Sequence, residues 1–148
     1  GEIPADIKAM IGLAANEAIT VNSQITPKNN ITLWGTGTPC REFLHVDDMA
    51  AASLYVMQLD QATYAANTQP MLSHINVGYG SDITIRQAAE AVAEVVGYQG
   101  KLEFDTSKPD GPPKKLMDSQ RLEKLGWKAG VALNQGLQQA YADYLAKA

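Results

Sequence analysis

Residues 31–57 read ITLWGTGTPCREFLHVDDMAAASLYVM, and this stretch decides the fold class. Ile31–Trp34 is rich in β-branched and aromatic side chains and predicts a short strand, closed by a glycine- and proline-containing turn at 35–39. Residues 43–46 predict a second short strand. Apolar residues then recur at helical spacing over 46–60, behind two aspartates that complement the dipole of a first helical turn. Strands followed by amphipathic helices indicate an α/β domain.

The rest of the chain continues this alternation. A loop with a helical turn is expected at 63–70, and a loop at 108–113, where three prolines remove the donors that a sheet needs. Further strands are predicted at 74–77 and 101–105. Helices are expected over 3–18, after Thr84 up to Gly97, after Asp118 or Ser119, and through Leu137–Leu145.

Composition narrows the class of protein. A length of 148 residues suits one domain over 1–148. The net charge of −4 argues against a nucleic-acid partner, and one cysteine excludes a disulfide framework and cysteine-based zinc sites. No apolar run approaches the length of a membrane helix, and the N-terminus lacks the pattern of a secretory signal. The sequence therefore predicts a cytoplasmic protein without a membrane partner or a metal site.

Two glycine pairs resemble the start of a dinucleotide-binding unit but do not complete it. That fingerprint requires a third glycine three residues after the second, for close packing of helix on strand. Ile83 stands there after Gly78 and Gly80, and Cys40 stands there after the pair at 35 and 37. We therefore interpret both pairs as turns and predict no cofactor-binding residue in this chain.

A second group combines cations, an acid and an aromatic side chain. Arginine and lysine bind phosphates, and carboxylates and aromatic faces bind sugar hydroxyls and rings. Trp34 and Arg41 lie in one segment, and 108–115 supplies an aspartate and three lysines in a proline-rich loop. Convergence of the two segments would make a nucleotide-sugar site. The alternative is a solvated lysine pair and a tryptophan at the edge of the core.

Three segments carry a resemblance to a known family: WGTGTPCREFLHVDDMA at 34–50, QPMLSHINVG at 69–78 and KPDGPPKKLMD at 108–118. Together with a Leu-Gly-Trp at 125–127, they resemble the C-terminal half of the GDP-L-fucose synthase family, over about 31–145. Members of that family are extended short-chain dehydrogenases/reductases, and they epimerise and reduce GDP-4-keto-6-deoxymannose with NADPH. The resemblance implies an α/β substrate-binding part of such a protein, lacking the N-terminal Rossmann nucleotide-binding core.

The resemblance also implies roles for individual residues. Trp34 and Arg41 match nucleotide-sugar contacts, with Arg41 at the diphosphate, and Asp110 and Lys115 match substrate-binding residues of one loop. Lys8 is a weaker candidate, because it stands alone where the family has a basic pair. The family's catalytic Ser, Tyr and Lys and its NADP-binding glycines are expected upstream of this chain. No catalytic residue is therefore predicted here, and the chain alone is expected to be inactive and to bind no cofactor.

One consequence concerns apolar surface. In the family that this chain resembles, the helix and strand predicted within 46–78 pack against the cofactor domain. Without it, large apolar side chains of this segment lose cover, which predicts a homo-oligomer formed through 46–78 or a rearranged packing of that segment. Two other functions stay open: a stand-alone nucleotide-sugar-binding module, and part of a related epimerase or dehydratase acting on a UDP- or dTDP-sugar.

Overall fold

The computed structural model describes residues 30–147, which fall into two compact units. Unit 1 comprises residues 30–40, 83–114 and 137–147, and unit 2 comprises 41–82 and 115–136. The helix predicted over 3–18 and the candidate Lys8 lie outside the described residues. Each unit is considered by itself.

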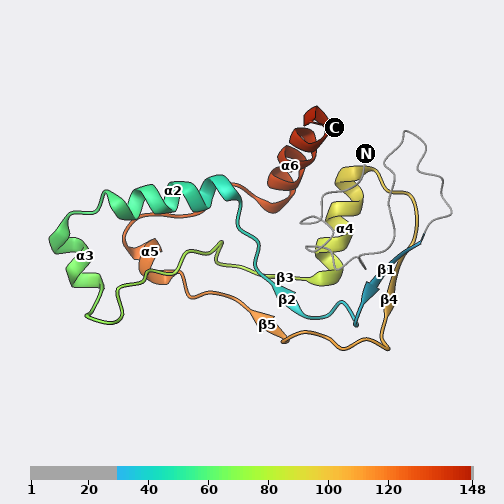
Figure 1. Ribbon diagram of the computed structural model, residues 1–148, viewed down its shortest axis with the longest axis horizontal. Helices are drawn as coiled ribbons and strands as arrows, with labels where there is room; N and C mark the ends of the chain where they lie inside the picture. The colour runs from blue at the N-terminus through green and yellow to red at the C-terminus, as the bar shows by residue number, and fades with distance from the viewer. Residues whose placement is uncertain (1–29, 148) are drawn as a thin grey trace. The chain divides into compact units, whose positions relative to one another are not determined.

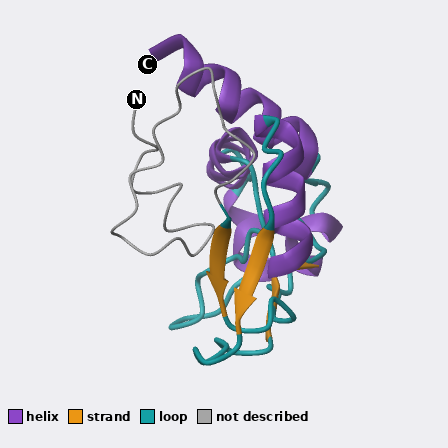
Figure 2. Cartoon of the chain, turned by 90° about the vertical axis from the view of Figure 1, so that its right-hand side faces the viewer, coloured by secondary structure: helices purple, strands orange, loops and turns teal. Residues whose placement is uncertain are grey.

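Unit 1 is built on a parallel strand pair. β1 (Ile31–Trp34) and β4 (Leu102–Asp105) run side by side in register, from Ile31 opposite Leu102 to Trp34 opposite Asp105 (Figures 1 and 2). Both strands were predicted and are confirmed. Leu33 of β1 is almost fully buried, as the alternation of a half-buried strand requires.

Helix α4 (Ile85–Val96) follows the pattern expected of it, including both ends. The Thr84 hydroxyl accepts a hydrogen bond from the Gln87 N–H, and the Gln87 side chain accepts one from the Thr84 N–H. This capping box satisfies donors that a helix start leaves unpaired. Gly97 ends the helix with φ +69°, a left-handed conformation that glycine adopts without strain.

A small three-stranded sheet has the order β3-β2-β5, formed by Ile83–Thr84, Cys40–Arg41 and Lys114–Lys115. The Cys40 N–H donates to the Pro113 carbonyl at 2.8 Å. The prediction of a strand at 43–46 was wrong, since β2 ends at Arg41 and the next residues lead into a helix.

Unit 2 contains α2 (Val46–Met57), α3 (Gln61–Asn67) and α5 (Gln120–Lys124). Helix α2 was predicted and is confirmed, although it stops before residue 60. The loop with a helical turn that was predicted over 63–70 is confirmed in kind: α3 runs to Asn67 and non-helical residues follow, and the Asp60 carboxylate caps α3 by accepting from the Thr63 N–H. The strand predicted at 74–77 is also not formed, since no described strand pairs with it.

The start of α2 is fixed by side chains that the sequence pattern only partly anticipates. His45 is the N-cap, and its Nδ1 accepts from the Asp47 N–H. Asp48, one of the two aspartates expected to complement the helix dipole, also accepts hydrogen bonds from the Gly130 and Val131 N–H groups at 3.0 and 2.9 Å. The segment after α5 therefore runs along α2 (Figure 1).

The remaining helices bear out their predictions. Helix α5 begins after Ser119 and buries Leu122 completely. Ser119 makes no side-chain capping bond, and the neighbouring Asp118 accepts from the Gln120 N–H instead. Helix α6 spans Leu133–Lys147 and includes the predicted apolar positions. Among residues 30–147, no helix has the length and apolar character required to cross a membrane.

Candidate functional site

Trp34 and Lys108 form an exposed platform at one edge of unit 1. Trp34 is the last residue of β1, and 56% of it is exposed to solvent. The Lys108 Nζ lies 5.6 Å from the centroid of the indole ring, within the range of a cation–π contact. Because Trp34 and Asp105 end two parallel strands, this edge is the carboxyl end of the pair, where α/β sheets commonly bind ligands.

Asp110 connects the proline-rich loop to the turn after β1. One carboxylate oxygen accepts from the Thr36 N–H at 2.8 Å and the other from the Thr36 hydroxyl at 2.7 Å. These two bonds, the hydroxyl bond first, hold the pKa of Asp110 below its ordinary value. Gly35 has φ +81°, and a Cβ on it would collide with the Asp110 carboxylate. Asp110 therefore fixes the backbone beside Trp34.

Unit 2 contains the other two candidates that the structure describes. Arg41 is half-buried in β2 and Lys115 is exposed in β5, and these strands are neighbours in the small sheet. The structure thus brings the predicted residues together in pairs: Trp34 with the Asp110 loop in unit 1, and Arg41 with Lys115 in unit 2. Their roles toward a ligand stay predictions.

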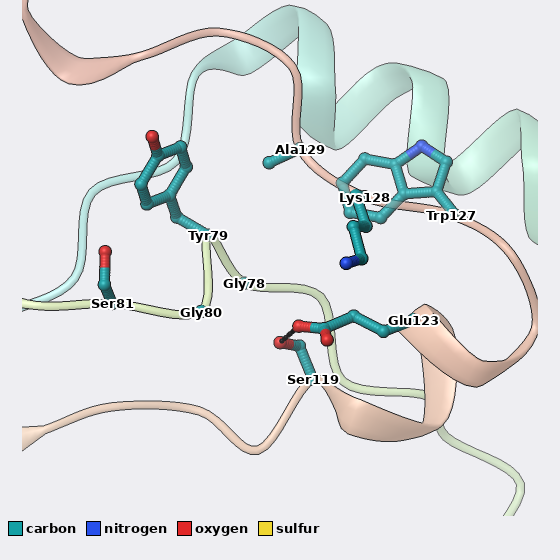
Figure 3. Close-up of a pocket in the computed structure, with 9 residues that line it drawn as sticks. All are labelled: Gly78, Tyr79, Gly80, Ser81, Ser119, Glu123, Trp127, Lys128 and Ala129. Carbon is teal, nitrogen blue, oxygen red and sulfur yellow. Dashed lines mark hydrogen bonds between the residues drawn. The ribbon is translucent and has the colours of Figure 1, made fainter.

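A pocket of about 290 Å³ lies in unit 2 (Figure 3). Figure 3 shows the Ser119 hydroxyl beside the Glu123 carboxylate, with an O–O distance of 3.2 Å, below the side chains of Trp127 and Lys128. None of the predicted site residues within 30–147 lines it. Its walls come from the turn at 78–81, from the two residues of that hydrogen bond, and from 127–129.

Sequence reasoning missed two contributors to these arrangements. Lys108 lay within the loop that was singled out, but its position over Trp34 follows from the pairing of β1 with β4, which no local pattern shows. Glu42 was quoted only as part of a motif, yet its carboxylate accepts hydrogen bonds from two distant backbone N–H groups. Pairs of a carboxylate and far-off amides have no sequence signature.

A metal ion and a phosphate are two further ligands to consider for the part of the chain that the structure describes. No group of three or more His, Cys, Asp or Glu side chains there is arranged to hold a metal ion. The start of α4 does not fit a phosphate, since the Thr84 side chain already occupies the Gln87 N–H that a phosphate would bind.

Comparison with known proteins places these features in a family. Residues 9–78 match the model of the NAD dependent epimerase/dehydratase family. The chain is 57% identical over 116 residues to GDP-L-fucose synthase of Escherichia coli (strain K12), which covers 78% of this chain and 36% of that protein. The chain thus spans about a third of the length of this relative.

Solved structures agree. A GDP-6-OMe-4-keto-L-xylo-heptose reductase from C. jejuni superposes with a TM-score of 0.74 at 37% identity, covering 82% of this chain and 35% of that one. A GDP-mannoheptose C4 reductase from Campylobacter jejuni with NADP bound gives a TM-score of 0.68 at 37% identity, covering 80% and 35%. The mixed α/β architecture and these matches show that the chain belongs to the NAD-dependent epimerase/dehydratase family of extended short-chain dehydrogenases/reductases, and that it corresponds to the C-terminal part of GDP-L-fucose synthase-like members.

Proposed function

We propose that this chain is the GDP-sugar-binding part of a GDP-L-fucose synthase, a protein that epimerises and reduces GDP-4-keto-6-deoxymannose with NADPH. The observation that carries the proposal is the exposed Trp34–Lys108 platform, held beside the Asp110-anchored loop in a chain whose relatives are named for GDP-sugars. An aromatic face beside an ammonium group suits a ligand that combines a planar base with phosphates.

Each candidate residue has chemistry that suits one part of a GDP-sugar. Trp34 offers a stacking face, which is worth about 1–3 kcal/mol per base in proteins that stack nucleobases. Arg41 is assigned to the diphosphate, because a guanidinium pairs with phosphate oxygens bidentately. Lys115 supplies a second positive charge from the neighbouring strand, and Lys8 is a further candidate outside the described residues. Their combined role is to hold the sugar in place, the positioning contribution to catalysis.

Base specificity separates this proposal from a UDP- or dTDP-sugar enzyme. The two reductases above are named for GDP-sugars at 37% identity, which favours guanine. In the longer relatives, the reacting Ser, Tyr and Lys and the NADP are assigned to the part that this chain does not match. We therefore expect no oxidation of NADPH by the 148-residue chain, and turnover in an absorbance assay would contradict this division.

Calorimetric titration with GDP and with UDP tests the binding. We expect binding of GDP that is tighter than that of UDP, and a loss of about 10–100-fold on Trp34→Ala, the equivalent of the stacking energy above. Trp127→Ala is the matched control, because Trp127 lines the pocket in unit 2 and not the platform. Equal losses for both variants, or no binding of GDP by the wild-type chain, would overturn the proposal.

We also propose that the chain self-associates through 46–78. Met49, Leu54 and Met57 of α2 are 44%, 58% and 80% exposed. Each such side chain gains about 1.5–3 kcal/mol when it is fully buried, so a second copy would be stabilised by covering them. Light scattering should show a mass above 16 kDa that falls on Met57→Lys; a monomer at every concentration would refute this.

A further inference from the structure

The Glu42 carboxylate joins three segments of unit 2. One oxygen accepts a hydrogen bond from the Gly80 N–H at 2.7 Å, and the other accepts one from the Met117 N–H at 3.1 Å. These donors lie 38 and 75 residues away in sequence. Because hydrogen bonds to a charged acceptor are stronger than neutral ones, this carboxylate is a clip between the end of β2, the turn at 78–81 and the segment after β5.

Gly78 shows how closely the clip is built. A Cβ placed on Gly78 would lie 2.5 Å from one Glu42 carboxylate oxygen and 2.9 Å from the other, too close for any real side chain. Gly78 has no positive φ, so the need for glycine here comes from the approach of Glu42 and not from backbone strain. The turn and the carboxylate therefore fit each other, and Gly78 itself is buried.

The clip adjoins both cations that the proposed function assigns to phosphate. Glu42 is the residue directly after Arg41, and Met117 comes two residues after Lys115. The bond from the Met117 N–H to the Glu42 side chain ties the residue after Arg41 to the segment after Lys115, which limits how far β2 and β5 can shift relative to each other at their unit 2 ends. Nothing in Glu42 has to touch a ligand for this to matter.

We propose that Glu42 is a positioning residue that holds Arg41 and Lys115 in register for a diphosphate. This inference rests on the proposed function, since it presumes that these two cations bind GDP. It assigns Glu42 no contact with the substrate. Its effect passes through the backbone N–H groups of Gly80 and Met117.

An electrostatic role of Glu42 and a positioning role predict opposite effects on the binding of GDP. A carboxylate beside Arg41 repels an anionic ligand, so removing its charge should tighten the binding of GDP if electrostatics were the only contribution. Positioning predicts weaker binding, because the two cations lose their common anchor. The sign of the change therefore separates the two explanations.

The first experiment measures amide exchange in the absence of ligand. In Glu42→Gln the side chain keeps one acceptor oxygen, and its NH₂ group faces the second backbone N–H without being able to accept from it. We therefore expect hydrogen exchange of the Gly80 amide, the Met117 amide or both to become about tenfold faster or more. Glu123→Gln is the matched control: it removes the same charge in the same unit, from a carboxylate whose recorded partner is a side-chain hydroxyl. Unchanged exchange at both amides would overturn the clip.

The second experiment is calorimetric titration with GDP of the wild-type chain, Glu42→Gln and Glu42→Asp. We expect at least about fivefold weaker binding in both variants, with Glu42→Asp keeping the charge but being too short to reach both amides. Wild-type binding with equal or tighter binding by both variants would overturn the positioning role and leave the proposed function standing. Absence of GDP binding by the folded wild-type chain would overturn both. Should Glu42→Gln fail to fold, Glu42→Asp decides alone.

Discussion

Asp48 offers the sharpest test of how unit 2 is held together. Only 8% of this residue is exposed, and its two carboxylate oxygens accept from the Gly130 and Val131 N–H groups. A hydrogen bond to a charged group contributes about 1.5–3 kcal/mol, so two of them set an upper limit of about 6 kcal/mol. Gly130 is exposed and water can replace its bond in part, which lowers the expected loss on Asp48→Ala to about 3–4 kcal/mol.

Asp48→Asn should lose less, about 2 kcal/mol, because the amide keeps one acceptor oxygen. The control is Asp47→Asn, on a neighbouring side chain that is 82% exposed and lies in the same helical turn. Both variants lose the same interaction with the helix dipole, about 0.3–1 kcal/mol, so the difference between them isolates the bonds to 130–131.

The assay is urea unfolding followed by the fluorescence of Trp127, in a Trp34→Phe background so that the signal reports on unit 2. We expect the midpoint to fall for Asp48→Asn with an unchanged slope, and to move little for Asp47→Asn. A difference between the two variants of less than about 0.5 kcal/mol in the free energy of unfolding would refute the reasoning. It would mean that water replaces the hydrogen bonds of Asp48 to the Gly130 and Val131 N–H groups with little loss of stability.

Three further predictions concern unit 1. The lowered pKa of Asp110 implies that its hydrogen bonds stabilise the fold fully above the ordinary carboxyl pKa and are lost as the pH falls through the lower folded value. NMR titration of the Thr36 amide should therefore show a midpoint below the carboxyl pKa of the unfolded chain. Asp110→Asn should abolish this titration of the Thr36 amide. Gly97→Ala should cost about 1 kcal/mol in thermal unfolding, since its φ is +69° but its surroundings are empty, whereas Gly35→Ala should cost more because it also displaces the Asp110 carboxylate. Thr84→Ala should lower the free energy of unfolding by about 1 kcal/mol, because the capping box is lost. A thermal unfolding midpoint equal to that of the wild type, followed by circular dichroism, would contradict this.

Local patterns carried the prediction of the fold where the physics is local. Helix α4 was predicted because its apolar positions, its N-cap Thr84 and its C-terminal Gly97 all lie within one stretch of fourteen residues. The strands at 31–34 and 101–105 were predicted from composition, although their parallel pairing was not. The strand at 74–77 was not confirmed, because strand formation depends on a partner that the pattern of one segment does not contain.

The candidate site divides in the same way. Residue types suited to phosphates and bases identified Trp34, Arg41 and the 108–115 loop, and the structure places them in two local groups. The role of Asp110 was predicted as ligand binding, and its recorded contacts are with Thr36. Both functions are compatible, since each carboxylate oxygen has a further lone pair.

Three carboxylates show why the sequence did not predict how the site loops are held. Glu42, Asp48 and Asp110 each bind backbone N–H groups 38 to 83 residues away. Such bonds replace ladder hydrogen bonds in the described part of the chain, where the strands are only two to four residues long. The loops that hold the candidate cations and the tryptophan therefore depend on individual acidic side chains. A substitution that conserves every proposed ligand residue but removes Glu42 should still weaken the site, because its geometry is set by the acceptors behind it.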